Sequence, residues 1–319
     1  MSDVYPLRFT PVYKEKIWGG RSLERLFGRD LPAGKRIGES WELADLAEGA
    51  SIVANGSAAG QSIATLVEQW GGGLLGRAGP TDDGRFPLLL KLLDANDILS
   101  LQVHPDRQAA AEIGPEAALK TECWYIIESR GGVIYKGVRP GVGPEQFRKA
   151  VGGDAADQVV RKIPVAAGDF HYLPAGTVHA LGAGVVVAEV QTPSDTTYRV
   201  TDWGRGRQIH LERSMQCIRF DLVDSQPGAA GQTLLVTDHF TVSRRLVRRG
   251  QAARLPAGRC AAMMVLAGRG VVACGGGAEA AVAFRAGDTL LLPAALESPA
   301  CQGQEDVWYL EIVLPEAPT

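Results

Sequence analysis

Four side chains of this 319-residue sequence could bind a metal ion together. Gln102 and His104 are two residues apart, so a strand would place both on the same face. With Glu122 and His179 they form a set of two imidazoles, one carboxylate and one amide. That set suits a Zn²⁺ ion that keeps one coordination position open for a substrate. The alternative is a buried polar network without a metal.

Residues 168–179 have the pattern of two strands joined by a tight turn. Aromatic residues alternate in the first half, as in a pleated strand with two unlike faces. Pro174 then fixes φ, and Gly176 permits a positive φ, as a tight turn requires. We therefore expect His179 on the second strand, with its imidazole directed into a barrel.

Two charged residues interrupt apolar runs. Lys91 and Glu189 each lie within a stretch typical of a buried strand, where an unpartnered charge is costly. Lys91 either pairs with Glu39 or Glu42 or contacts an anionic ligand. Glu189 either titrates in a functional site or pairs with a lysine or an arginine.

Two further cations are candidates for the same site. Lys120 lies two residues before Glu122, so it should share that strand face and enter the same cavity. Arg199 follows a turn-like segment, and its fixed charge suits an anionic ligand. The alternative for Arg199 is an ion pair with Asp195 or Asp202.

Short β-like runs separated by Gly, Pro and Asp dominate the sequence and favour a sandwich or a barrel. They cover residues 87–93, 124–128, 132–138, 170–174, 185–190, 234–236, 242–246, 263–266, 289–293 and 307–313. Helical patterns are few and connect the strands, at residues 62–70, 107–113, 143–150 and 211–219. Asp106 is interpreted as the N-cap of the second of these helices rather than as a support for a metal ligand.

An internal repeat links the two halves of the chain. Residues 168–174 and 287–293 both read Gly-Asp, four strand residues, then Pro. Where the first copy has its glutamate and its second histidine, the second copy has Ala261 and Ser298. The second copy is therefore expected to bind no metal.

The predicted fold is all-β, with two jelly-roll barrels and a few short connecting helices. We place a catalytic, metal-binding domain at residues 1–220 and a second, degenerate barrel at residues 233–319. Ser, Pro and several Gly between residues 221 and 232 mark the break.

Charge, cysteine content and hydropathy indicate which partners and which cellular location to expect. A net charge of −3 argues against a general nucleic-acid surface, and Arg244-Arg245 and Arg248-Arg249 are interpreted as a solvated strand edge. Five scattered cysteines without a C-x-x-C pair are typical of a reduced protein. No signal peptide or membrane-length apolar run is present, so we expect a cytoplasmic protein without a membrane partner.

Several uncommon motifs, in order and spacing, resemble the type I mannose-6-phosphate isomerases of the short bacterial class. They are PVYK at 11–14, IWGG at 17–20, GESWE at 38–42, LSLQVHPD at 99–106, KTECWY at 120–125 and PSDTTYR at 193–199. The resemblance spans nearly the whole chain. It implies a cupin barrel that interconverts mannose 6-phosphate and fructose 6-phosphate through an enediol(ate), with one zinc ion per chain and a sugar phosphate as its small-molecule partner.

The resemblance also assigns roles to individual residues. His104, Glu122 and His179 fall on the zinc ligands, and Gln102 falls on an amide ligand of the longer members. Arg199 falls on the active-site arginine.

The remaining assignments concern the substrate. Lys91 and Ser100 match phosphate contacts, Asp195 lies in a substrate-binding motif, and Lys120 matches a substrate-contacting lysine. Lys120 and Glu189 are both candidates for the general base.

Two other functions fit parts of the pattern. Two histidines and a carboxylate also describe non-haem Fe(II) dioxygenases, and a sugar-phosphate isomerase of different specificity would use the same fold. A dioxygenase acting on a neutral substrate would not need the cations Lys91, Lys120 and Arg199. A non-catalytic sugar-phosphate-binding regulator would keep the fold without turnover.

Overall fold

Apolar runs punctuated by glycine and proline form the strands of two units in the computed structural model, which describes residues 4–153, 155–222, 232–275 and 281–316. Unit 1 comprises residues 1–12, 41–89 and 227–319, and unit 2 comprises residues 13–40 and 90–226. The all-β class predicted from the strand pattern is confirmed, since strands dominate both units and the helices are short.

Unit 2 is built on two sheets. The six-stranded sheet has the order β12 (Phe170–Leu173), β9 (Glu122–Ser129), β14 (Val185–Gln191), β7 (Leu89–Ala95), β3 (Ile37–Leu43) and β2 (Val12–Gly20). The five-stranded sheet has the order β11 (Val160–Pro164), β10 (Val133–Val138), β13 (His179–Leu181), β8 (Leu101–Val103) and β15 (Tyr198–Thr201). Its helices are α1 (Ser22–Phe27), α4 (Arg107–Ile113), α5 (Pro144–Gly152), α6 (Leu211–Cys217) and the short 3₁₀ helix η1 (Ala156–Gln158).

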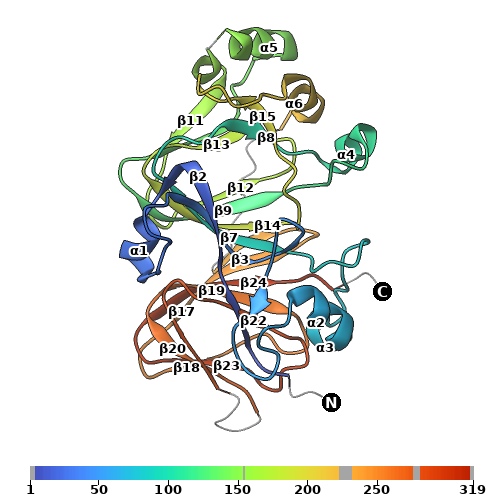
Figure 1. Ribbon diagram of the computed structural model, residues 1–319. Helices are drawn as coiled ribbons and strands as arrows, with labels where there is room; N and C mark the ends of the chain where they lie inside the picture. The colour runs from blue at the N-terminus through green and yellow to red at the C-terminus, as the bar shows by residue number, and fades with distance from the viewer. Residues whose placement is uncertain (1–3, 154, 223–231, 276–280, 317–319) are drawn as a thin grey trace. The chain divides into compact units, whose positions relative to one another are not determined.

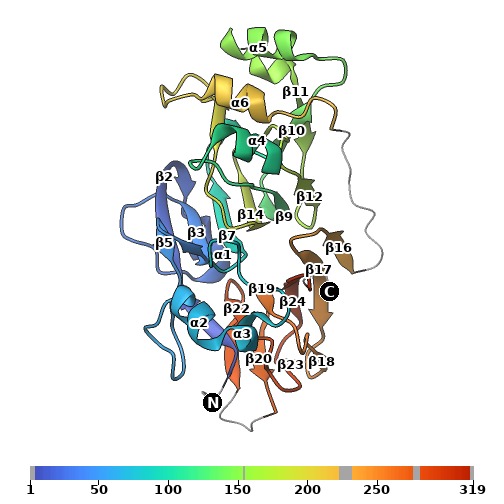
Figure 2. The same cartoon turned by 90° about the vertical axis from the view of Figure 1, so that its right-hand side faces the viewer.

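Strand alternation decides what enters the interior of unit 2. On β9, Trp124 and Ile126 are buried with Leu173 of β12 and Leu181 of β13 in one apolar cluster. Glu122 has the same strand parity as Trp124, so it faces the same interior. Helices α4, α5 and α6 gather at one end of this unit (Figures 1 and 2).

Unit 1 contains a seven-stranded and a four-stranded sheet. The larger has the order β16 (Thr233–Val236), β17 (Thr241–Val247), β24 (Val307–Val313), β19 (Ala261–Ala267), β22 (Thr289–Leu292), β1 (Leu7–Thr10) and β6 (Ile52–Val53). The smaller has the order β18 (Ala252–Arg254), β23 (Ala300–Gly303), β20 (Arg269–Ala273) and β21 (Val282–Arg285). A two-stranded ribbon of β4 (Asp45–Leu46) and β5 (Gly49–Ala50), with helices α2 (Ile63–Trp70) and α3 (Gly72–Leu75), completes the unit.

The units divide the chain differently from the boundaries proposed from sequence. The N-terminal strand β1 pairs with β22, with Leu7 opposite Leu291, and with β6, with Phe9 opposite Val53. Residues 41–89 also belong to unit 1, although sequence analysis assigned them to the catalytic domain. Pairing between strands far apart in the sequence places these residues in unit 1. A division of the chain at one point cannot represent such a unit. Most of the proposed break at residues 221–232 lies outside the described residues.

The internal repeat appears in the structure as a shared strand register. Glu122 lies opposite Leu173 where β9 pairs with β12, and Ala261 lies opposite Leu292 where β19 pairs with β22. The strand order β12-β9-β14-β7 of unit 2 matches β22-β19-β24-β17 of unit 1. Ala261 therefore occupies the position of Glu122, as the sequence alignment of the two copies predicted.

All four predicted helices form, and two of them, α2 and α4, begin with a side-chain N-cap, of which the one at Asp106 was predicted. Ser62 accepts a hydrogen bond from the Thr65 N–H at the start of α2, and Asp106 accepts one of 2.8 Å from the Ala109 N–H at the start of α4. The interpretation of Asp106 as an N-cap is confirmed. The sequence patterns missed α1, α3 and η1, which are short, at 6, 4 and 3 residues, and so have too few turns for a clear period.

We expect Asp106→Ala to lower the free energy of unfolding by about 1 kcal/mol, as loss of a helix N-cap typically does. Asp106→Asn keeps the cap and removes the charge that pairs with Arg219. Burial alone would raise the pKa of Asp106, but the Ala109 N–H and Arg219 stabilise the carboxylate and lower it. The charge therefore stabilises the fold above the ordinary carboxyl pKa and stops doing so as the pH falls through the lower folded value. Urea unfolding should show wild type above the Asn variant at pH 7 and a smaller gap at pH 3, and an equal gap at both would contradict this.

Two further features concern the cysteines and the length of the helices. All five cysteines carry free thiols. No helix among the described residues is long and apolar enough to cross a membrane.

Candidate metal centre and cavity

His104, Glu122 and His179 meet in the interior of unit 2. One ligand atom from each of these buried side chains lies within 4.8 Å of the others. The Glu122 carboxylate lies between the imidazoles, with Oε2 3.3 Å from His104 Nε2 and Oε1 3.2 Å from His179 Nε2. Glu122 begins β9 of one sheet, His179 begins β13 of the other, and His104 follows β8. The predicted cluster thus forms where the two sheets face each other.

The turn predicted before His179 positions its imidazole. Pro174 accepts a hydrogen bond from the Thr177 N–H, and Gly176 has φ +87°, a left-handed conformation that favours glycine. A Cβ at Gly176 would lie 2.4 Å from Arg219 Cγ, so the close approach also requires glycine. His179 follows with its side chain 1% exposed.

The hydrogen bonds behind the two imidazoles set them up as metal ligands. His104 Nδ1 lies 2.9 Å from the Thr196 carbonyl oxygen, and His179 Nδ1 lies 2.8 Å from that of Thr177. A carbonyl only accepts, so each Nδ1 carries the proton and each Nε2 directs a lone pair into the cluster. Burial, then the charge of Lys120, lowers the pKa of His104 to about 3, which keeps this imidazole neutral.

The cluster has donor atoms that the protein alone does not satisfy. Among the described residues, His104 Nε2 and both oxygens of Glu122 are buried without a hydrogen-bond partner. Burial would raise the pKa of Glu122, but Lys120, His104 and His179 outweigh it and hold that pKa well below its usual range. A carboxylate and two imidazoles whose Nε2 atoms face it form a donor set that a zinc ion accepts, so these residues fit the metal.

Gln102 and Lys120 adjoin the cluster. Gln102 Nε2 lies 3.2 Å from His179 Nε2, and rotation of the amide by 180° would bring its oxygen to the same point. Lys120 Nζ lies 3.3 Å from Glu122 Oε2. Lys120 therefore shares the face of Glu122, as its spacing predicted.

A cavity of about 270 Å³ lies beside the cluster. Its polar lining includes seven residues that sequence analysis proposed for the site, namely Lys91, Ser100, Gln102, Lys120, Glu189, Asp195 and Arg199. It also includes residues that sequence analysis did not propose there, namely Lys16, Glu39, Thr197 and Arg207. The structure thus brings the proposed substrate residues together next to the metal ligands.

Lys91 and Glu189 form a buried ion pair. Lys91 Nζ lies 3.2 Å from Glu189 Oε1, and each side chain is 4% exposed. Trp124 donates a hydrogen bond of 2.8 Å from Nε1 to the other oxygen of Glu189. Of the alternatives left open, Glu189 has the lysine partner, and Glu39 forms an ion pair with Lys16, at 2.9 Å.

The charge balance of the cavity shifts both pKa values of this pair upward. For Lys91, burial would lower the pKa, but the negative charges of Glu189, Glu39 and Asp195 outweigh it and raise the pKa. For Glu189, burial and then the charge of Glu122 raise the pKa, and the attraction of Lys91 offsets only part of that effect.

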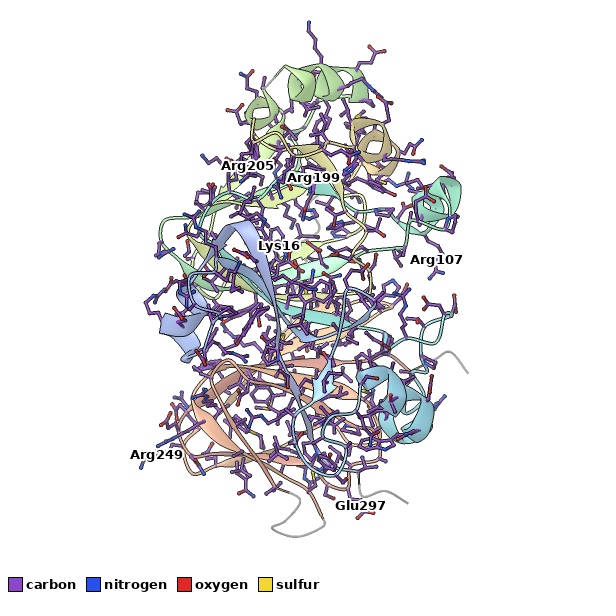
Figure 3. The ribbon with its side chains drawn as sticks, viewed as in Figure 1. Lys16, Arg107, Arg199, Arg205, Arg249 and Glu297 are labelled. Atoms are coloured by element: carbon purple, nitrogen blue, oxygen red, sulfur yellow. The ribbon has the colours of Figure 1, made fainter. Side chains whose placement is uncertain are left out.

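The guanidinium of Arg199 is held by a backbone carbonyl rather than by Asp195 or Asp202, the carboxylates of the alternative interpretation. Arg199 donates from Nη1 to the carbonyl of Gln208, and its buried Nε has no hydrogen-bond partner in the described part of the chain. Asp202 instead accepts hydrogen bonds from Arg205 and Arg207. Burial and then Arg207 lower the pKa of Arg199, although the guanidinium stays charged. Figure 3 shows Arg199, Arg205 and Lys16 on the same side of unit 2.

Some of the missed cavity residues carried a weak signal in the sequence. Lys16 and Trp18 are two apart on β2, so the alternation that buries Trp18 also directs Lys16 to the same face. Arg207 lies in an irregular segment, where no periodicity predicts the direction of a side chain.

The chain is similar in sequence and in fold to known mannose-6-phosphate isomerases. Residues 7–125 match the family model described as "Phosphomannose isomerase type I, catalytic domain". A mannose-6-phosphate isomerase of Streptococcus mutans is 35% identical over 308 residues, covering 92% of this chain and 94% of that protein. The Bacillus subtilis protein named mannose-6-phosphate isomerase ManA is 34% identical over 309 residues, covering 90% and 93%. A crystal structure of a mannose 6-phosphate isomerase from Bacillus subtilis has a TM-score of 0.84 at 30% identity and covers 97% of this chain and 99% of that one.

Proposed function

Because the chain belongs to the family of type I phosphomannose isomerases, we propose that it interconverts mannose 6-phosphate and fructose 6-phosphate with the help of one zinc ion. The observation that carries the proposal is the position of the cluster His104, Glu122 and His179 beside a cavity lined by five basic and three acidic side chains. The excess of positive charge favours an anionic substrate. It disfavours a dioxygenase acting on a neutral one.

The three cluster residues would hold the zinc ion, with the amide of Gln102 as a fourth ligand. Bound there, zinc would supply a Lewis acid that polarises the carbonyl and hydroxyl oxygens of the open-chain sugar. The buried ligand atoms that have no hydrogen-bond partner among the described residues, and the neutral imidazole of His104, support this assignment.

The isomerisation moves a proton between C2 and C1 of the sugar, and negative charge develops on the oxygens as an enediolate forms. Arg199 would stabilise that charge, because its buried Nε has no hydrogen-bond partner in the described ranges and its side chain lines the cavity. Lys120, 3.3 Å from a ligand oxygen, would place a second positive charge near the same oxygens.

We assign the proton transfer to Glu189. Trp124 and Lys91 orient its carboxylate, and Glu189 lines the cavity. Its raised pKa brings the group toward the range in which a carboxylate can both accept and return a proton. Lys91 is then the charge partner that keeps this carboxylate able to release its proton.

The phosphate would lie among the remaining cationic and polar groups of the cavity. Ser100 and Lys91 are the contacts that the family resemblance implies, and Asp195 would accept a sugar hydroxyl. Arg207 lines the same cavity, so its guanidinium adds positive charge there. A fixed phosphate orients the flexible open-chain sugar relative to Glu189.

A coupled assay tests the function directly. Purified protein should convert mannose 6-phosphate to fructose 6-phosphate, lose the activity on chelation and regain it with Zn²⁺. Absence of turnover by zinc-loaded, folded protein that still binds mannose 6-phosphate would instead support the non-catalytic regulator.

We expect Glu189→Gln to reduce kcat by about 10²- to 10⁴-fold, because the amide keeps the shape and the Trp124 contact but cannot accept the proton. Zinc content should stay at the wild-type level. Solvent exchange separates proton transfer from binding, so the variant should also lose exchange of the substrate C2 proton into deuterated water, followed by NMR. Wild-type exchange in Glu189→Gln, with Lys120→Gln inactive, would move the base to Lys120.

A further inference from the structure

Unit 1 contains a cavity of its own, with a volume of about 390 Å³. Its lining includes Gln232, Arg245, Arg254, Leu255, Tyr309 and Glu311. Tyr309 belongs to the apolar core of unit 1, and Glu311 lies two residues further on the same face of β24. The cavity thus adjoins the interior of this unit.

The strand register relates this cavity to the catalytic one. Glu311 lies opposite Met263 on β19, and Glu189 lies opposite Trp124 on β9. Met263 and Trp124 each come two residues after the matched positions of the repeat. Glu311 therefore occupies in unit 1 the position that Glu189 occupies in unit 2.

The cationic partner is retained as well. Glu189 pairs with Lys91 from β7, the strand next to β14, and Glu311 pairs with Arg245 from β17, the strand next to β24. Arg245 donates to Glu311 Oε1 from Nε and Nη2, at 3.0 and 2.8 Å, and from Nη1 to Gln232 Oε1 at 2.8 Å. The Glu311 side chain is 8% exposed. The Arg245 side chain is 37% exposed, in line with its interpretation as solvated, but it lies on the inner strand β17, where strand parity also directs it to the cavity.

The metal ligands, by contrast, are not retained. Ala261 and Ser298 take the positions of the glutamate and the second histidine, and neither side chain can replace those donors. What the second copy keeps is a cavity with a buried carboxylate and its cation, which suits binding rather than metal-assisted chemistry.

Charge indicates the class of ligand. Arg254, an exposed residue of β18, adds a second guanidinium to the lining and forms no ion pair with any described residue. Two guanidinium groups therefore face one carboxylate, and guanidinium groups bind phosphate through paired N–H donors. Glu311 offers acceptors for hydroxyl groups, and Leu255 and Tyr309 offer apolar surface for carbon atoms. We propose that unit 1 carries a second binding site, for a phosphorylated polyol or sugar.

Isothermal titration with glucitol 6-phosphate tests the site, because this probe has no carbonyl and cannot be isomerised. Wild-type holoenzyme should bind two equivalents per chain, and one dissociation constant should equal the inhibition constant for the isomerase reaction. Arg254→Gln should weaken the other equivalent by about tenfold or more, as loss of a charged hydrogen bond typically does, and leave the inhibition constant unchanged. Arg269→Gln, an exposed arginine of unit 1 paired with Glu305, is the matched control and should change neither value.

A second variant should change phosphate binding in the opposite direction. Glu311→Gln removes the charge that neutralises Arg245, so it should tighten the binding of inorganic phosphate at this site, whereas Arg254→Gln should weaken it. A single equivalent of glucitol 6-phosphate in wild type would overturn the proposal, as would two equivalents that neither variant alters. Because the inhibition constant reports the catalytic cavity separately, failure here leaves the proposed isomerase function standing.

Discussion

His179→Ala is expected to abolish both zinc binding and isomerase activity. The histidine is one of three protein ligands, its side chain is 1% exposed, and its Nε2 lies 3.2 Å from Glu122 Oε1. Its removal leaves two ligands and the amide of Gln102. These groups bind zinc too weakly to retain it during gel filtration. Elemental analysis after gel filtration should find near one zinc per wild-type chain and background zinc in the variant, and the coupled assay should find background turnover.

Two further variants separate metal loss from unfolding. Glu122→Gln keeps the volume of the side chain and removes its charge, so it should lose zinc while retaining the wild-type circular dichroism spectrum. His210→Ala removes a histidine of the same unit that is outside the cluster and should retain zinc. Full zinc occupancy in folded His179→Ala would show that the metal lies elsewhere.

Arg199→Ala is expected to lower kcat by roughly 10²- to 10³-fold, as removal of one preorganised donor to a developing charge typically does. The buried Nε of Arg199 has no hydrogen-bond partner among the residues described, so it is available to the substrate oxygens. Zinc content should stay near the wild-type level, because Arg199 is not a ligand. Steady-state kinetics with metal analysis on the same preparation measures both.

The unphosphorylated sugar distinguishes catalysis from phosphate binding. A catalytic Arg199 should matter for mannose as much as for mannose 6-phosphate. Ser100→Ala provides the contrast, since loss of a phosphate contact should raise KM for mannose 6-phosphate and leave the rate on mannose unchanged. Equal rates of wild type and Arg199→Ala on mannose would make Arg199 a phosphate ligand only.

Local sequence rules determined much of the site. The order of Pro174 and Gly176 predicted the turn that presents His179, and the spacing of two residues placed Lys120 on the face of Glu122. The cap at Asp106 was likewise predictable. Each of these features depends on backbone dihedral preferences or on strand alternation, which act over a few residues and are readable from the chain.

The internal repeat also made one position in unit 1 predictable. Because the two copies share turn chemistry and strand length, the alignment predicted that Ala261 would take the place of Glu122, and the strand register has it there. Even so, strand parity says only which side chains share a face.

The tertiary structure alone decided the partners. Lys91 pairs with Glu189, a partner that its neighbours in the sequence do not indicate. Asp202 accepts hydrogen bonds from Arg205 and Arg207, and Arg199 forms no ion pair within the described part of the chain. These choices depend on which strands become neighbours and how loops close across the sheets. The turn before His179 and the strand face shared by Lys120 and Glu122 were predictable because they depend on neighbouring residues, and the repeat was predictable because its two copies share a sequence pattern. Pairing of buried charges and unit membership depend on contacts between distant segments, whose free energies exist only once the barrels have closed.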